Sequence, residues 1–465
     1  MAVCSLKTTA LLLLCLFISS LPRNCSPVCA KETTTPAPPS LKGDGIADET
    51  LALQALFNSS PAGTAMVLPA GKYRITKPLV IDLDTHGPFS LQGQGATLLI
   101  DGAGPALKLQ GTHYKSADPS GFEKRVWQNQ RMPLIDGLAI TSRNPQADAI
   151  VAAGTMQLTI SRVQIRNCRH AIRLVENNRN VILSEVHLYE NSGVGVYLDD
   201  VNLHQINIGN SHISYNAQGG IVSRGGNVRN LHITGCDIES NMGVNEAPTA
   251  NVLIDCSQSS AGTGEVAITG CTIQHNHKAK GSANVRLIGN SKPVEEGTIV
   301  REGHVTITGN IFSDVFTNVH LQHCRGVTMT GNTFWMGFDQ NLLVEDCAHV
   351  VMGANAFDRN PRYSYSDSTT SANSLVFRRT FASTLSGLHI SHINKAEAAI
   401  LFEDCQRLHL TGCSLFDCQV PELKFRGCQN CRVGEVLISR ENRSDDHQPL
   451  ILEDCSGMMI KELDF

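Results

Sequence analysis

Charged and aromatic side chains recur at nearly regular intervals in the middle of this sequence, and their types could support chemistry on a sugar. Asp199 and Asp255 flank Arg224. Two carboxylates are what acid–base hydrolysis of a glycosidic bond needs. His320 or Tyr197 could instead act as a base on an acidic sugar proton while an arginine neutralises the sugar carboxylate, which is the chemistry of a lyase or an epimerase. The candidate catalytic residues are Asp199, Asp255, His320 and Tyr197, and the candidate substrate-binding residues are Arg173, Arg224, Arg286 and Trp127.

These residues come together only if the chain repeats, and it does. The segment VTITGNIFSD, from Val305, aligns with VTMTGNTFWM, from Val327, and NVHLQHC aligns with NLLVEDC. The same register extends over most of the chain in units of roughly 20 to 27 residues, which is typical of a solenoid. Each unit holds two alternating apolar runs separated by Gly or Asn, so the units are built of strands. The helix-forming half of a leucine-rich repeat is missing. We therefore predict an all-β, single-stranded parallel β-helix, in which each coil hydrogen-bonds to the coils above and below.

The repeat register places the candidate residues on one face. Apolar inward positions of the second run alternate with an outward row, and a further outward row follows two residues later. The first row reads Arg173, Tyr197, Val222, Leu253, Arg286 and His320, and the second reads Val175, Asp199, Arg224, Asp255, Ile288 and Gln322.

Neighbours in such rows come within reach of one another. We expect Asp199, Arg224 and Asp255 on one exposed strip in consecutive coils, in a concave surface shared with Tyr197, Arg286 and His320. The strand spacing puts the two aspartates about 9.6 Å apart along the axis, close to the separation of an inverting hydrolase. The alternative is a solvated face whose opposite charges merely pair. A register error of one residue would also move the whole set to the other face.

A long insertion adds a further candidate residue, whereas the two aspartates make a poor metal site. The segment 111–131 interrupts the repeat and holds Trp127, one of only two tryptophans. Long loops in a compact fold are usually functional, so Trp127 could serve as a sugar platform, or it could simply pin its own loop. Asp199 and Asp255 could hold Ca²⁺, but two carboxylates are too few ligands. We expect no metal and no cofactor.

The chain begins with the features of an exported protein. Residues 1–30 hold a single charge, Lys7, before the apolar run TALLLLCLFISSL, which predicts a signal peptide; a membrane anchor is the alternative. Residues 31–40 are expected to be a linker, and residues 41–465 to be the β-helix. The net charge of −5 argues against nucleic-acid binding. We expect a secreted or periplasmic protein without a membrane contact after cleavage; the sequence does not indicate an oligomeric state.

The 16 cysteines follow the repeat and not a disulfide pattern. One repeat position holds either Cys or Asn, and a second, at the end of the second run, is mostly Cys. Buried free cysteine behaves as a small hydrophobe. We therefore predict a ladder of mostly reduced thiols inside the coils, although neighbouring coils are close enough for a few disulfides. The first position holds Cys236, Cys271, Asn310, Asn332, Asn355 and Cys413, and the second holds Cys256, Cys324, Cys347, Cys405, Cys428 and Cys455.

The segment from Leu41 to Gly104 resembles a known superfamily. KGDGIADETLALQALFN is similar to the start of the pectate-lyase-like right-handed β-helix proteins, and MVLPAGKYRITKPLVI resembles their next strand motif. The resemblance implies a right-handed β-helix with a capping helix near 48–58, in which Asp48 caps the helix. It also implies a polysaccharide as partner, although the superfamily holds glycoside hydrolases, polysaccharide lyases, epimerases, tailspikes and non-catalytic surface proteins.

One activity within that superfamily is excluded by the residues. The coils that would carry the polygalacturonase set read QADAI, CRHAI, SGVGV and QGGIV. Asp148 stands at the first catalytic aspartate, but Arg169 and His170 replace the aspartate pair and Val194 replaces the histidine. We interpret Asp148 as a turn residue. The leading hypothesis is a secreted glycoside hydrolase or polysaccharide lyase acting on a polysaccharide along the groove, and the alternative is a non-catalytic extracellular binding or structural protein.

Overall fold

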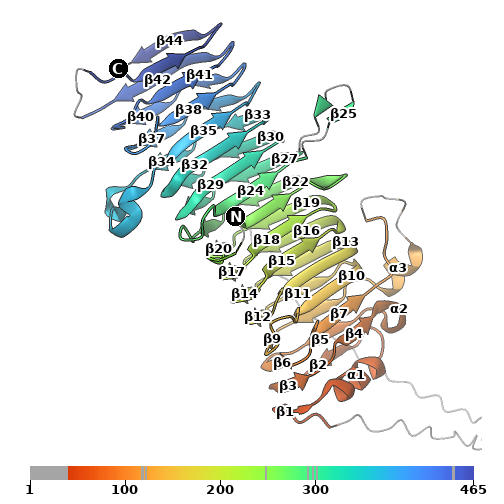
Figure 1. The fold of residues 1–465 in the computed structure, drawn as a ribbon. Coiled ribbons are helices and arrows are strands. Elements are labelled where there is room, and N and C mark those ends of the chain that lie inside the picture. The colour runs from red at the N-terminus through yellow and green to blue at the C-terminus, as the bar shows by residue number, and fades with distance from the viewer. Residues whose placement is uncertain are drawn as a thin grey trace, which may run out of the picture. The chain divides into compact units, whose positions relative to one another are not determined.

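The structure, a computed structural model, describes residues 40–116, 120, 123–246, 249–290, 293–295, 298–299, 302–441 and 446–464. The predicted signal segment 1–30 and all but the last residue of the predicted linker 31–40 lie outside the described residues. The unit from Pro39 to Phe465 is compact by itself. It confirms the predicted right-handed parallel β-helix as a stack of strands wound into successive coils (Figure 1).

Each coil contributes strands to three faces, which we name A, B and C. Within a face every strand pairs in parallel with the strand of the next coil. The strands are parallel because the chain completes a full coil before it returns to the same face in the same direction. Face A carries the two outward rows predicted from the sequence. Its strands are β4 (Leu79–Asp82), β7 (Leu107–Gln110), β10 (Ile150–Met156), the first half of β13 (Ile172–Ser184), β15 (Val194–Asp199), β18 (Gly219–Arg224), β21 (Ala250–Asp255), β24 (Ala283–Ile288), β29 (Val315–Gln322), β32 (Gly337–Glu345), β35 (Ser374–Arg378), β38 (Ile400–Glu403), β41 (Leu423–Arg426) and β43 (Leu450–Glu453).

Face B follows face A around the turn. Its strands are β2 (Ala65–Val67), β5 (Ser90–Gln92), β8 (Leu134–Asp136), β11 (Thr159–Ser161), the second half of β13, β16 (Asn202–Gly209), β19 (Asn227–Thr234), β22 (Gly262–Thr269), β27 (Glu302–Thr308), β30 (Cys324–Thr330), β33 (Ala348–Met352), β36 (Thr384–Ser386), β39 (His409–Thr411), β42 (Arg432–Ser439) and β44 (Met459–Asp464).

Face C closes each coil. Its strands are β1 (Asp44–Asp48), β3 (Gly71–Ile75), β6 (Ala96–Ile100), β9 (Ala139–Ser142), β12 (Gln164–Arg166), β14 (His187–Tyr189), β17 (His212–Ser214), β20 (Asp237–Glu239), β23 (Thr272–Gln274), β28 (Ile311–Ser313), β31 (Thr333–Phe334), β34 (Ala356–Asp358), β37 (His389–Ser391) and β40 (Ser414–Phe416), and the second half of β42 completes it.

Helices are few and lie outside the coils. The predicted N-terminal helix is α1 (Thr50–Ser59), which buries Leu53 and Phe57 against the first coils. Its N-cap is Glu49 and not Asp48, but the Asp48 carboxylate still accepts the backbone N–H of Thr50. The other helical segments are α2 (Leu83–His86), α3 (Lys124–Asn129), η2 (Pro361–Tyr363) and η3 (Ser366–Thr370), and a small hairpin is formed by β25 (Pro293–Glu295) and β26 (Thr298–Ile299).

The interior is ordered into columns, because equivalent residues stack from coil to coil. Phe312, Phe334 and Phe357 stack with ring centroids 4.9 and 4.5 Å apart. A second column consists of asparagines that hydrogen-bond side chain to side chain at 2.7–2.9 Å; its members are Asn191, Asn216, Asn241, Asn251, Asn284, Asn318 and Asn341.

The cysteine ladder is confirmed in the described residues. All 12 cysteines there are free, and 11 are buried. Cysteine and asparagine play the same part in one column: the backbone N–H of Cys236 donates to the Cys271 sulfur at 3.4 Å, and that of Cys271 donates to the Asn310 side chain at 2.9 Å. Burial raises the pKa of the Cys256 thiol to about 12, so this thiol is unreactive in the folded state.

Thiol titration should therefore separate the folded from the unfolded protein. We expect few reactive thiols in the native protein, since burial suppresses the thiolate. Denaturation without reductant should expose most of the cysteines to a colorimetric thiol reagent. Recovery close to zero after denaturation would reveal disulfides throughout and contradict the ladder.

Candidate functional site

The two outward rows on face A are paired in the predicted register. Tyr197 lies beside Arg173, and Asp199 beside Arg224, which in turn lies beside Asp255. His320 lies beside Arg286. Because these partners are in adjacent parallel strands, their side chains lean out of the same sheet about 4.8 Å apart.

The expected shared surface is nevertheless divided into two groups. Val222 and Leu253 occupy the middle of the first row and are buried in a small apolar cluster over face A. In the second row, Ile288 and Gln322 follow Asp255 in the next two coils. Arg286 and His320 are thereby separated from the residues further toward the N-terminus. We name the N-terminal group the acid–arginine strip; it consists of Asp148, Arg173, Tyr197, Asp199, Arg224 and Asp255.

Asp148 anchors the strip. The sequence interpretation assigned it only to a turn and missed this role. It lies in the turn before β10, as expected, but its side chain is only 4% exposed. Arg169 donates two hydrogen bonds of 2.7 Å to its carboxylate, and Arg173 approaches it at 3.5 Å. Burial works to raise the pKa of Asp148, but the hydrogen bonds and charge of Arg169 and the interactions with His170 together outweigh it, and the pKa lies below its usual value. Asp148 is therefore a buried anion that fixes two arginines.

Arg173, which is held by Asp148, binds the next carboxylate of the strip, that of Asp199. Arg173 Nε donates to Asp199 Oδ2 at 2.8 Å, and its Nη2 makes a second, shorter contact with the same oxygen. Tyr197 packs beside Asp199 and against the ring of His170, at 5.1 Å between centroids. Burial and the charge of Asp199 raise the pKa of Tyr197. At neutral pH its hydroxyl is thus a proton-bearing group that can donate a hydrogen bond.

His170 is a structural support. Its Nδ1 accepts the backbone N–H of Val194 at 3.0 Å, and burial lowers its pKa to about 4. The ring is therefore neutral at pH 7. It fills the space beside Tyr197 without adding charge to the strip.

Arg224 is held more loosely than arginines at the same repeat position further along the stack. Its ion pair with Asp255 is 3.6 Å long, and 56% of its side chain is exposed. Asp255 also accepts a hydrogen bond of 2.7 Å from the Ser257 hydroxyl. By contrast, Arg426 pairs with Glu403 at 2.7 Å and with Glu453 at 2.9 Å.

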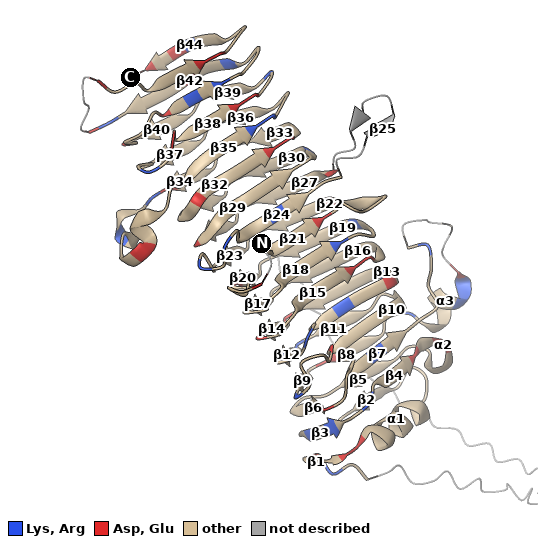
Figure 2. Ribbon diagram, viewed as in Figure 1, with Lys and Arg blue, Asp and Glu red and all other residues tan. Residues whose placement is uncertain are grey.

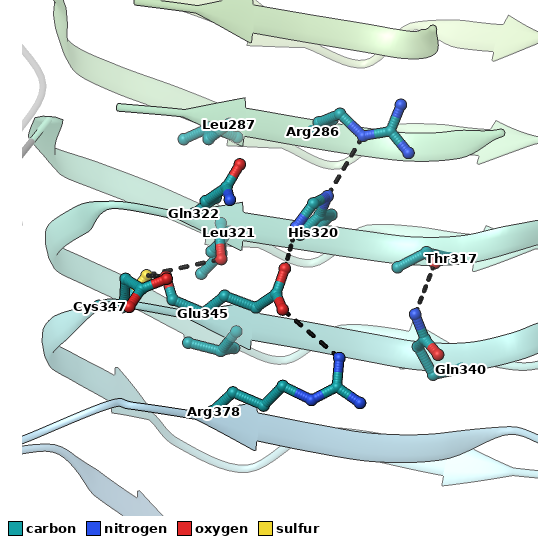
Figure 3. A network of polar contacts seen from close by, with 12 residues as sticks. Arg286, Leu287, Thr317, His320, Leu321, Gln322, Gln340, Glu345, Cys347 and Arg378 are labelled. Atoms are coloured by element: carbon teal, nitrogen blue, oxygen red, sulfur yellow. Dashed lines mark hydrogen bonds and ion pairs between the residues drawn. The ribbon is translucent and has the colours of Figure 1, made fainter. Parts of the chain in front are cut away.

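The second group forms a linear network across β24, β29, β32 and β35 (Figure 3). Arg286 Nε donates to His320 Nδ1 at 3.3 Å, and His320 Nε2 lies 3.2 Å from Glu345 Oε2. Glu345 is also paired with Arg378. Arg286 donates further to the backbone oxygens of Thr249 and Gly281. His320 and Arg286 are therefore joined to each other and engaged by the protein.

The second row becomes a ladder of alternating charge in the C-terminal coils. Acidic and basic residues recur along this sheet (Figure 2), and the members of the ladder are Glu345, Arg378, Glu403, Arg426 and Glu453. Exposed pairs of this kind contribute little to stability singly. In these coils the interpretation of the row as a paired, solvated face is the better one.

Trp127 lies apart from the strip. It is on α3, and 43% of it is exposed. The α3 segment is tied to α2 by an ion pair between Arg125 and Asp84 and by a hydrogen bond of 2.8 Å from Gln130 to Asp84. Met132, which follows α3, lines a groove on face B. Trp127 is thus placed near the start of face B.

Comparison with known families identifies the coil architecture. Residues 126–263 match the profile "Right handed beta helix region", and residues 265–435 match the profile "Periplasmic copper-binding protein (NosD)". No curated protein sequence matches. In the part of the chain that the structure describes, no group of three or more His, Cys, Asp or Glu side chains is arranged to hold a metal ion. The described residues therefore do not fit a copper site.

Two solved tailspike structures support the same fold. Tailspike protein 3 of bacteriophage CBA120 is 14% identical, with a TM-score of 0.50; the match covers 89% of this chain and 59% of that one. A variant of the tailspike of E. coli bacteriophage HK620, in complex with a pentasaccharide, is 12% identical, with a TM-score of 0.54, and 90% of this chain and 77% of that one are covered. The A-module of the Azotobacter vinelandii mannuronan C-5 epimerase AlgE4 is 13% identical, with a lower TM-score of 0.43; the match covers 91% of this chain and 95% of that one.

The right-handed β-helix profile and the two tailspike structures place the chain among the proteins with the right-handed parallel β-helix fold, and no specific enzyme family is matched. The chain spans 59% of the length of the CBA120 tailspike. Among the helices that the structure describes, none has the length and apolar character needed to cross a membrane.

Proposed function

We propose that this right-handed parallel β-helix is a secreted or periplasmic carbohydrate-active protein that binds a polysaccharide along the acid–arginine strip. The observation that carries the proposal is the state of Arg224. It stands in a row where arginines elsewhere are clamped by carboxylates of both neighbouring coils, yet it keeps 56% of its side chain exposed and has one long ion pair. A guanidinium in that state can bind the hydroxyl or carboxylate oxygens of a sugar.

The neighbours of Arg224 complete a polar surface suited to sugars. The raised pKa of Tyr197 keeps its hydroxyl protonated as a donor. Asp199 and Asp255 add acceptor oxygens in the coils on either side of Arg224. Donors and acceptors that alternate from coil to coil match a linear chain of sugar units lying along the stack.

Binding is better supported than cleavage at the strip. Asp199 and Asp255 are both engaged as acceptors, by Arg173 and by Ser257, whereas hydrolysis needs one carboxyl group that donates a proton. Tyr197 cannot serve as a base at neutral pH, because its raised pKa keeps the hydroxyl protonated. His320 is paired with Arg286, several coils beyond Arg224. We therefore assign Tyr197, Asp199 and Asp255, together with Arg173 and Arg224, to binding and give His320 no part at the strip; the hydrolase and lyase mechanisms there are the weaker hypotheses.

Two comparisons favour the proposal. The HK620 tailspike, which has the same fold, was solved with a bound pentasaccharide. The NosD profile is described as periplasmic, which agrees with the signal peptide expected at residues 1–30.

Arg224→Ala should weaken polysaccharide binding. Loss of hydrogen bonds from a charged group costs about 1.5–3 kcal/mol, so the dissociation constant should rise roughly tenfold to a hundredfold. The measurement is retention of the full chain on a panel of immobilised acidic and neutral polysaccharides, followed by titration calorimetry with the polysaccharide that binds best.

Arg426→Ala is the matched control, because Arg426 has the same repeat position and is clamped by Glu403 and Glu453. It should bind like the wild type once circular dichroism confirms that it is folded. Equal affinity of wild type and Arg224→Ala, or equal losses in both variants, would exclude the strip as the binding surface.

A further inference from the structure

Face B carries a groove of about 550 Å³ across β11, β13, β16 and β19. Its lining is mainly neutral amides from successive coils, with Met132 and Ile182 as apolar contacts. None of the described residues that line it is Asp, Glu, Lys or Arg. The amides include Gln157, Asn180, Gln205 and Asn230.

These four amides form a row. Their backbone φ values are all between 55° and 67°, so they share the same turn conformation at one repeat position, and the flanking residues are paired in adjacent coils. Gln157 Oε1 and Asn180 Oδ1 are buried and have no hydrogen-bond partner in the described structure. An amide offers both a donor and an acceptor, which is what an uncharged sugar hydroxyl requires.

The row leads into a second pocket of about 340 Å³, over β19, β22, β27 and β30. Glu265 takes the next place after Asn230, and Asn230 Nδ2 donates to Glu265 Oε2 at 2.5 Å. The same pocket is lined by Glu302, Arg229, His304 and Arg325. An amide groove thus ends at two carboxyl groups, one of which is oriented by the last amide.

The absence of a side chain at Gly262 leaves room for the Glu302 carboxyl group in this pocket. Gly262 has a φ of +73°, and a Cβ there would lie 2.3 Å from both Glu302 carboxylate oxygens. Arg229 is held beside it by the carbonyl oxygens of Val228 and Gly262, each at 2.8 Å. In the described part of the chain the Glu302 carboxyl group has no hydrogen-bond or ion-pair partner, so it is available to a ligand.

Burial raises the pKa of Glu302 to about 7, against the opposing charge of Arg229. The other titratable groups that line the same pocket are Glu265 on β22, His304 on β27 and Arg325 on β30, and the Cys256 thiol after β21 interacts with Glu302. Near neutral pH, Glu302 therefore carries a proton in a large fraction of molecules and can give it away. That is the condition required of a general acid.

We propose that the face B groove is a second carbohydrate site, in which a neutral glycan lies on the amide row and is hydrolysed between Glu302 and Glu265. Glu302 gives its proton to the glycosidic oxygen as the bond from that oxygen to the anomeric carbon breaks. Water forms the new bond to the anomeric carbon and gives its proton to Glu265. The products are two shorter glycans, and one water molecule is consumed.

The test is release of reducing ends from a panel of neutral polysaccharides, namely glucans, mannans, xylans and galactans. We expect hydrolysis by the wild-type full chain and a loss of about 100- to 10,000-fold in kcat for Glu302→Gln and for Glu265→Gln. The wild-type rate should fall as the pH rises through about 7, since Glu302 must be protonated. Release of reducing ends from none of these polysaccharides by the wild-type protein would overturn the proposal.

Glu435→Gln is the control, because Glu435 also has a positive φ, of 54°, and lies outside the groove on β42. It should keep the wild-type rate, and a loss equal to that of Glu302→Gln would overturn the assignment. The inference does not rest on the acid–arginine strip. Loss of binding in Arg224→Ala tests face A, and loss of hydrolysis in Glu302→Gln, with Glu435→Gln as its control, tests face B, so failure of one proposal is distinguishable from failure of the other.

Discussion

Replacing Asn284 by aspartate should strongly destabilise the β-helix. The Asn284 amide donates to Ser313 O at 2.9 Å and to Asn318 Oδ1 at 2.7 Å, and it is fully buried. Aspartate has the same shape but no donor, so both acceptors lose their partner and face a carboxylate. At about 1–3 kcal/mol for each orphaned buried group, the free energy of unfolding should fall by about 2–6 kcal/mol.

The measurement is the midpoint of urea unfolding, followed by circular dichroism. Asn210→Asp is the control, since Asn210 is exposed at a turn, and it should change stability by less than about 0.5 kcal/mol. Equal midpoints for the two variants would show that the asparagine column adds nothing specific to the fold.

The repeat made the fold predictable, because a β-helix exposes its periodicity in the sequence. Each coil needs apolar residues at the same inward positions, so these residues recur at a fixed spacing in the sequence. Val305 and Val327 therefore align in the sequence and pair in space. The exchange of Cys271 with Asn310 likewise indicated a shared column, and each of the two side chains accepts a hydrogen bond from the backbone N–H of the equivalent residue in the preceding coil.

The site could be predicted only as far as the register reaches. Asp199, Arg224 and Asp255 lie in the predicted row, because one residue per coil fixes the register. Whether a charge is free depends on the lengths and directions of side chains, which the register does not contain. Arg224, which has one long ion pair, and Arg426, which is paired on both sides, occupy the same repeat position, so the sequence pattern does not distinguish them.

Turns and insertions hid other functional candidates. Glu302 follows the insertion between β24 and β27, where the repeat is broken, so no alignment of coils assigns it a role. Asp148 was interpreted as a turn residue from its position. Its part as a buried anion became visible only with Arg169 and Arg173 folded over it.

Asp148→Asn should destabilise the protein and reduce its sensitivity to acid. Removing one member of a buried ion pair costs about 3–5 kcal/mol, and the expected loss here is about 2–4 kcal/mol because 38% of the Arg169 side chain remains exposed to solvent. The matched control is Asp346→Asn, since Arg379 makes the same two-bond contact to Asp346 at the surface. Its cost should be about 0–1 kcal/mol.

The pH dependence of this loss has a definite sign. The pKa of Asp148 is lowered in the folded protein, so its contribution to stability is present above the unfolded value of about 3.9 and disappears as the pH falls through the lower, folded value. The difference between wild type and Asp148→Asn should therefore be greatest near pH 7 and shrink below about pH 4. Urea unfolding at a series of pH values tests this. A difference that stays constant or grows on acidification would show that Asp148 does not act as the buried anion that orients Arg169 and Arg173, and with them the strip to which Asp199 belongs.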